Sequence, residues 1–70
     1  MGRWVLANRW HFGSDTNQRL FEEVLDDADV RFEREMLTNA TVVENVHNAE
    51  EWSQLALELG GQMLGDRWYG

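Results

Sequence analysis

The sequence predicts one small α+β domain, and three observations lead to that class. Apolar and polar residues alternate along residues 3–12 and again, more briefly, within residues 30–47, which is the period of half-buried strands. Residues 15–28 and 48–64 instead repeat their apolar residues every three or four positions, as amphipathic helices do. The chain has 70 residues and neither a linker nor an internal repeat, so residues 1–70 are expected to form a single domain.

The first strand, expected over residues 3–12, has one strongly apolar face. That face carries Trp4, Leu6, Asn8, Trp10 and Phe12. The other face carries Arg3, Val5, Ala7, Arg9 and His11. We therefore expect the face with the tryptophans to pack against the helices and the other face to remain open.

The first helix is expected over residues 15–28. Gly13-Ser14 interrupts the strand pattern, and Asp15 followed by Gln18 three residues later resembles a capping box. The apolar stripe of this helix consists of Leu20, Phe21, Val24, Leu25 and Ala28. A helix with one such stripe packs it onto the rest of the fold.

Residues 30–37 and 41–47 are predicted to form a hairpin around the loop Thr38-Asn39-Ala40. The expected register places opposite charges between two apolar pairs, which supports it. It pairs Phe32 with Val46, Arg34 with Glu44 and Met36 with Val42. In the alternative, the first helix continues through Met36, but its apolar residues would then scatter around the helix instead of forming a stripe.

The second helix is expected over residues 48–64, because Asn48 and Glu51 have the spacing of a helix cap and a helical period follows them. Gly65 would end this helix. In the alternative, the helix ends at Gly60 and residues 62–64 form a separate turn. Residues 67–69 either add a last strand or remain a tail.

The resulting order is β-α-β-β-α with an optional final strand. It resembles a ferredoxin-like fold or a truncated variant of it, with the helices packed on one face of an antiparallel sheet. This fold hosts many unrelated functions, so it does not indicate one.

Composition restricts the partners and the compartment. The formal net charge is −7, so a direct nucleic-acid partner is not expected, because affinity for nucleic acid comes largely from cations that neutralise phosphates. No apolar stretch is long enough to span a membrane, and the absence of cysteine fits a reducing compartment. We therefore expect no membrane partner and a cytoplasmic location. The core of so short a chain is marginal, which favours a homodimer.

The candidate partner-binding residues are acids of the first helix and aromatics near the chain end. The acids are Glu22, Glu23, Asp26, Asp27 and Asp29. Within this set, two pairs of like charges stand four residues apart, which costs free energy without an evident structural gain. The structural alternative is a solvated face that maintains solubility. Trp68 and Tyr69 lie beyond the last periodic segment, where they would contact a partner or a second copy.

No catalytic, metal or cofactor site is expected. The two histidines, His11 and His47, have no cysteine or carboxylate at metal-ligand spacing, and neither Ser14 nor Ser53 lies in the sequence context of a nucleophile. The sequence thus favours a non-enzymatic module that docks its acidic helix face on a basic protein or nucleoprotein complex. In size and charge it is similar to small phage-encoded inhibitors and nucleic-acid mimics that block host enzymes or CRISPR complexes.

Two other functions remain open at this point. One is binding of single-stranded nucleic acid through a cationic strip on the open sheet face. The strip would consist of Arg3, Arg9, His11, Arg31 and His47. The other is a small subunit or enzyme without a recognisable site.

Overall fold

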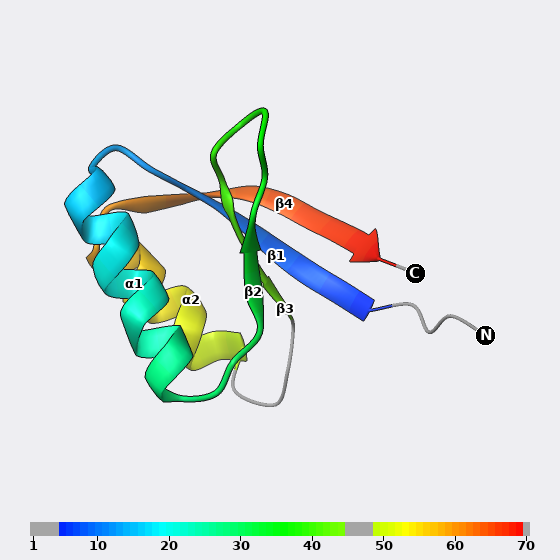
Figure 1. Cartoon of the computed structure of the whole chain (residues 1–70), viewed down its shortest axis with the longest axis horizontal. Coiled ribbons are helices and arrows are strands. Elements are labelled where there is room, and N and C mark those ends of the chain that lie inside the picture. The colour runs from blue at the N-terminus through cyan, green and yellow to red at the C-terminus, as the bar shows by residue number, and fades with distance from the viewer. Residues whose placement is uncertain (1–4, 45–48, 70) are drawn as a thin grey trace.

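The computed structural model describes residues 5–44 and 49–69, with the side chains of residues 6–44 and 50–66. The elements are β1 (Val5–Phe12), α1 (Asp15–Asp27), β2 (Phe32–Arg34), β3 (Thr41–Glu44), α2 (Ala49–Glu58) and β4 (Gly61–Tyr69) (Figure 1). The α+β class and the order β-α-β-β-α are confirmed, and the optional final strand is present.

The four strands form one antiparallel sheet in the order β2-β3-β1-β4, so β2 and β4 are its edges. Both helices pack on the same face of the sheet, and the ends of β1 and β4 that carry Val5 and Tyr69 extend beyond them (Figure 1). This is the complete ferredoxin-like order rather than a truncated variant. Within the described residues, no helix has the length and apolar character needed to cross a membrane.

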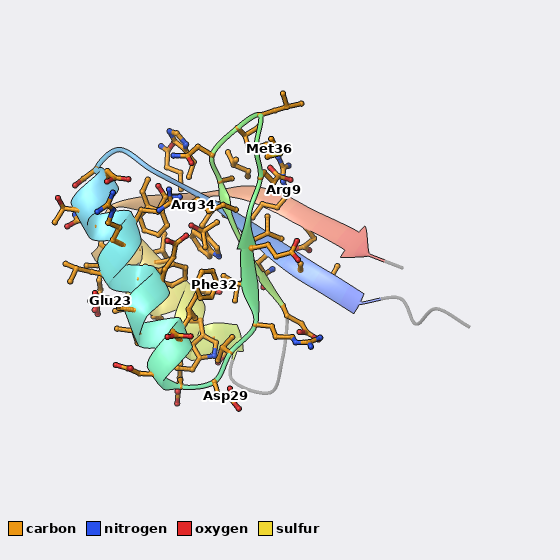
Figure 2. All side chains as sticks on the ribbon, viewed as in Figure 1. Arg9, Glu23, Asp29, Phe32, Arg34 and Met36 are labelled. Atoms are coloured by element: carbon orange, nitrogen blue, oxygen red, sulfur yellow. The ribbon has the colours of Figure 1, made fainter. Side chains whose placement is uncertain are left out.

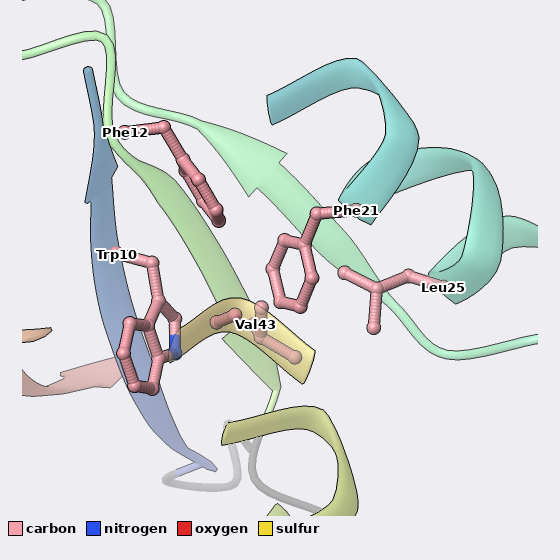
Figure 3. Packing of buried hydrophobic residues seen from close by; sticks show 6 residues of the cluster. Trp10, Phe12, Phe21, Leu25 and Val43 are labelled. Carbon is pink, nitrogen blue, oxygen red and sulfur yellow. The ribbon is translucent and has the colours of Figure 1, made fainter. Parts of the chain in front are cut away.

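The core lies between the sheet and the two helices. It is built from Trp10, Phe12, Phe21, Leu25, Val43 and Ala56 (Figure 3). The rings of Phe12 and Phe21 have centroids 5.2 Å apart, which joins β1 to α1 directly. Trp10 is 2% exposed, so the expected inward face of the first strand is confirmed there. Trp4, expected on the same face, lies outside the described residues.

α1 begins where the sequence predicts, but with a different cap. The N-cap is Ser14, whose Oγ accepts a hydrogen bond of 3.3 Å from the N–H of Asn17. Gln18 is 2% exposed and donates instead to the Asn39 carbonyl at 2.7 Å and to Thr41 Oγ1 at 2.9 Å. The expected capping box over Asp15 and Gln18 is therefore wrong, because a buried amide must be satisfied and its acceptors lie beside β3.

α1 ends in a Schellman motif. The N–H of Val30 donates to the Leu25 carbonyl at 2.8 Å, and the N–H of Asp29 donates to the Asp26 carbonyl at 3.0 Å. Asp29 occupies the position of this motif that favours glycine and has a φ of 60°. Val30 then packs against the core and leads the chain into β2.

The hairpin interpretation of residues 30–47 is confirmed over the helical alternative, but its register is wrong by three residues. Phe32 pairs with Val43 and Arg34 pairs with Thr41. The reason is the turn, which begins earlier than expected: the N–H of Glu35 donates to the Ala40 carbonyl at 2.9 Å. Asn39 adopts the left-handed position of this turn with a φ of 57°. Met36 is therefore in the loop and does not face Val42, and Val46 lies outside the described residues.

α2 is shorter than expected because a glycine terminates it. Gly60 has a φ of 82° and donates its N–H to the Leu57 carbonyl at 3.1 Å. The alternative in which the helix ends at Gly60 is thus the better one, although residues 62–64 belong to β4 and not to a turn. Gly65 lies within β4 at a shift in the pairing with β1, so its expected role as helix terminator is wrong. The Asn48 cap lies outside the described residues.

Candidate functional site

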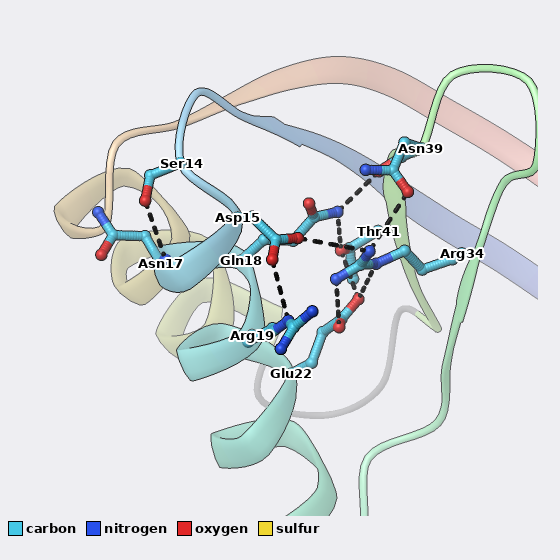
Figure 4. Close-up of polar contacts among 9 residues, drawn as sticks. All are labelled: Ser14, Asp15, Asn17, Gln18, Arg19, Glu22, Arg34, Asn39 and Thr41. Atoms are coloured by element: carbon cyan, nitrogen blue, oxygen red, sulfur yellow. Dashed lines mark hydrogen bonds and ion pairs between the residues drawn. The ribbon is translucent and has the colours of Figure 1, made fainter.

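The acids predicted at the partner-binding surface separate into two groups. Glu22 points toward the sheet, where Arg34 donates from Nε and Nη2 to its two carboxylate oxygens, each at 2.9 Å (Figure 4). Thr41 Oγ1 donates a third hydrogen bond of 2.8 Å to the same group. The Glu22 side chain is only 14% exposed, so it is engaged inside the fold rather than offered to a partner.

The Glu22 carboxylate belongs to a polar network that fixes α1 to the hairpin. Arg34 also donates to Asn39 Oδ1 at 3.3 Å, and Gln18 links the same turn to α1. The hydrogen bond with Glu22 raises the pKa of Arg34 above its ordinary value, because it favours the charged guanidinium. These contacts hold α1 at a defined position over β2 and β3.

The second group consists of Glu23, Asp26, Asp27 and Asp29 and is called the acidic helix end below. All four residues are exposed. Among the described residues, no cation lies within 4.0 Å of any of the four carboxylates. Figure 2 shows Glu23 directed away from the sheet and Asp29 at the end of α1. Their charges are therefore presented to solvent without a counter-charge from the described part of the chain.

The acidic helix end is unfavourable for the isolated protein in three ways. Glu23 and Asp27 are like charges four residues apart, which costs about 0.2–0.5 kcal/mol. The last turn of α1 contains no basic residue, although the helix dipole favours cations there. Asp29 holds a left-handed conformation that costs a residue with a Cβ more than glycine.

The whole net charge of the protein lies on its helices. α1 contains five acids and one arginine, and α2 contains three acids, so the two helices together account for the formal charge of −7. The remaining five acids and five arginines of the chain cancel. Since both helices cover one face of the sheet, the helix layer on that face is strongly acidic.

Trp68 and Tyr69 lie in β4, opposite Leu6 and Val5 of β1. They are thus part of an edge strand and not a tail, although their side chains lie outside the described part. Figure 1 places α1 and this end of β4 on opposite sides of the molecule. The structure therefore does not bring the predicted acids and aromatics together into one site.

The cationic strip expected on the open sheet face is interrupted. Arg9 donates to both carboxylate oxygens of Glu35, from Nε at 3.0 Å and from Nη2 at 2.8 Å. His11 and Arg31 are exposed, whereas Arg3 and His47 lie outside the described residues. At Arg9, therefore, the described part of the strip contains an ion pair rather than an available cation.

One exposed feature was not expected from the sequence. Met36 and Leu37 form the tip of the loop between β2 and β3, and each is 99% exposed. Glu35 fixes the base of this loop by accepting a hydrogen bond of 2.6 Å from Thr38 Oγ1. Apolar and polar residues do not alternate at Met36 and Leu37 in a way that distinguishes a loop from a strand. The available sequence signal for the turn was Asn39, because asparagine tolerates the left-handed conformation.

The described residues contain no cluster of three or more histidines or carboxylates that could hold a metal ion. Comparisons with models of protein families, with characterised proteins and with solved structures give no match.

Proposed function

We propose that this protein is a non-enzymatic protein-binding module that docks its acidic helix end on a basic surface of a partner protein or nucleoprotein complex. The observation that carries the proposal is the group of four exposed carboxylates, Glu23, Asp26, Asp27 and Asp29, with no described cation beside them. A basic partner supplies cations beside these carboxylates, so the repulsion among them in the free protein is replaced by attraction in the complex.

The distribution of charge supports the same mode of binding. A layer of charge −7 on one face of a small domain orients the molecule as it approaches a basic surface and raises the association rate. The basic surface of a nucleic-acid-handling protein is the natural target, because its cations are arranged to neutralise phosphates. In this form the module is an inhibitor of the phage-encoded kind, in which helix carboxylates replace phosphates and block the site.

The test compares two triple variants that change the net charge equally. The first, Glu23→Gln/Asp26→Asn/Asp27→Asn, neutralises the acidic helix end, and the second, Glu50→Gln/Glu51→Gln/Glu58→Gln, neutralises α2. The partner is captured from the source cells with the parent chain, identified by mass spectrometry and purified, and its association with each chain is measured by surface plasmon resonance. We expect the first variant to associate about tenfold more slowly at low salt and the second to change much less.

Salt provides the second readout. The difference between the parent and the first variant should shrink as salt is raised to about 0.5 M, because the interaction is one between exposed charges. Equal association rates for the parent and the first variant at low salt would contradict the proposal, as would a partner without a basic surface. A salt-sensitive gel shift of the free protein with single-stranded RNA would favour the cationic strip on the open sheet face instead.

A further inference from the structure

β4 is the long free edge of the sheet. The strand order places β2 and β4 outermost, and no described strand pairs with the outer side of either. β2 has three residues, whereas β4 has nine. Proteins usually keep free edge strands short or strongly charged, because a row of unpaired N–H and C=O groups invites another strand. β2 follows this rule and β4 does not.

β4 is also a neutral part of a highly charged molecule. Its one acid, Asp66, and its one base, Arg67, cancel, whereas the helix layer carries the whole formal charge of −7. Asp66 in addition accepts a hydrogen bond of 2.6 Å from Asn8 of β1. Two copies that approach through their helices repel each other, whereas two copies that approach through β4 meet without a local excess of like charge.

The middle of β4 carries apolar side chains that one copy leaves partly uncovered. Met63 is 49% exposed and Leu64 is 43% exposed. The pairing with β1 shifts at this point: Gly65 lies opposite Arg9 and Met63 lies opposite Trp10, so Leu64 has no opposite residue on β1. The edge thus combines unpaired backbone groups with apolar side chains at the same place.

We propose that β4 pairs with β4 of a second copy, antiparallel and about a two-fold axis, so that the two sheets join into one continuous sheet. Leu64 is adjacent to the middle residue of β4, so the two copies of Leu64 lie close to the axis. An axis perpendicular to the sheet keeps both helix layers on the same face, and the dimer therefore presents two acidic helix ends on that face. This assigns a surface to the homodimer expected from the sequence.

Salt affects this dimer in the opposite direction from the binding of a basic partner. The two helix layers carry like charge on one face, so their repulsion falls as ions screen it. We expect sedimentation equilibrium of the full chain to give a dissociation constant that decreases when salt is raised. The two interactions can therefore fail independently of each other.

A pair of matched substitutions locates the interface. Leu64→Lys places two cations near the axis and blocks the edge. We expect it to raise the dimer dissociation constant at least about tenfold, even though the smaller net negative charge by itself reduces the repulsion between the copies. Leu57→Lys makes the same change on α2 at a residue that is 60% exposed. Because it lowers the charge of the helix layer away from the edge, it should leave the dimer unchanged or slightly tighter.

A measurement on the unmodified chain tests the same interface even if a variant fails to fold. Hydrogen exchange of the β4 amides should slow as the protein concentration rises, whereas the amides of α1 should not respond. A parent chain that stays monomeric up to about 1 mM in high salt would overturn the proposal. The proposal would also be overturned if Leu64→Lys or Met63→Lys folds and still dimerises as the parent does. Exchange of the β4 amides that does not depend on protein concentration would overturn it as well.

Discussion

Arg34 of β2 and Glu22 of α1 form a bidentate ion pair in which both nitrogen–oxygen distances are 2.9 Å. Thr41 of β3 donates to the same carboxylate at 2.8 Å, so one side chain joins three elements. We expect Glu22→Gln to lower the free energy of unfolding by about 1–2 kcal/mol, because the amide forms weaker hydrogen bonds and directs an N–H group toward a partner that can only donate. Urea denaturation followed by circular dichroism measures the change.

Glu23→Gln is the matched control for this prediction. It removes the same charge from the next residue of α1, but Glu23 is exposed and has no described ion pair. The control should therefore be at least as stable as the parent, with a gain of no more than a few tenths of a kcal/mol from the lost repulsion between Glu23 and Asp27. Equal losses in the two variants would mean that the charge of α1, and not the contact with Arg34, determines the effect.

The left-handed conformation of Asp29 leads us to expect that a substitution at this position stabilises the protein. Glycine adopts the left-handed conformation without the steric cost of a Cβ, so we expect Asp29→Gly to raise the free energy of unfolding by about 0.5–1 kcal/mol. Asp29→Ala separates conformation from charge, because it removes the carboxylate but keeps the Cβ. If Asp29→Ala stabilises as much as Asp29→Gly, the benefit comes from removing a charge at the end of α1 and not from the backbone.

Gly61 is required because the start of β4 lies very close to both α2 and the Phe12 ring of β1. A Cβ at this position would lie 2.8 Å from the Ala56 carbonyl oxygen and 2.9 Å from Phe12 Cε2. Since neither a helix carbonyl nor a buried ring moves easily, we expect Gly61→Ala to destabilise the fold by about 1–3 kcal/mol. Gly13→Ala is the control, because a Cβ at Gly13 meets nothing within 4 Å. A Gly61→Ala variant that melts at the parent temperature would show that α2 and the Phe12 ring can shift away from β4.

The fold class was predictable because the hydrophobic period distinguishes β1 and the hairpin from α1 and the first part of α2, although it also assigned residues 61–64, which belong to β4, to a helix. Trp10 and Phe12 on one face of a strand, and Phe21 and Leu25 on one stripe of a helix, are buried as that period requires. The register of the hairpin was not predictable from the pairing of Arg34 with Glu44, because opposite charges on a surface contribute little. The buried amide of Gln18 holds the turn through the Asn39 carbonyl, and this contact spans 21 residues of sequence.

The candidate site was predictable only as a set of charges. Sequence spacing placed Glu22 and Asp26 on the same helix, but the direction of Glu22 depends on Arg34, which comes from another element. Period alone also could not show that Trp68 lies in an edge strand, because Met63 and Leu64 of β4 fit the helical period of α2, and the glycine at position 60 does not show whether a strand or a turn follows it. Both outcomes are set by the tertiary packing of the chain.

The last prediction concerns the stability of the acidic helix end when no partner is bound. Glu23→Gln/Asp26→Asn/Asp27→Asn removes two like-charge pairs and the acids that the helix dipole disfavours. The free energy of unfolding should therefore rise at low salt, by a few tenths of a kcal/mol per pair, and the gain should disappear at high salt. Glu50→Gln/Glu51→Gln should have the opposite effect, because these acids lie in the first turn of α2, where the dipole favours them. Melting temperatures in low and high salt provide the comparison, and a triple variant less stable than the parent at low salt would mean that its three carboxylates have stabilising partners within the chain.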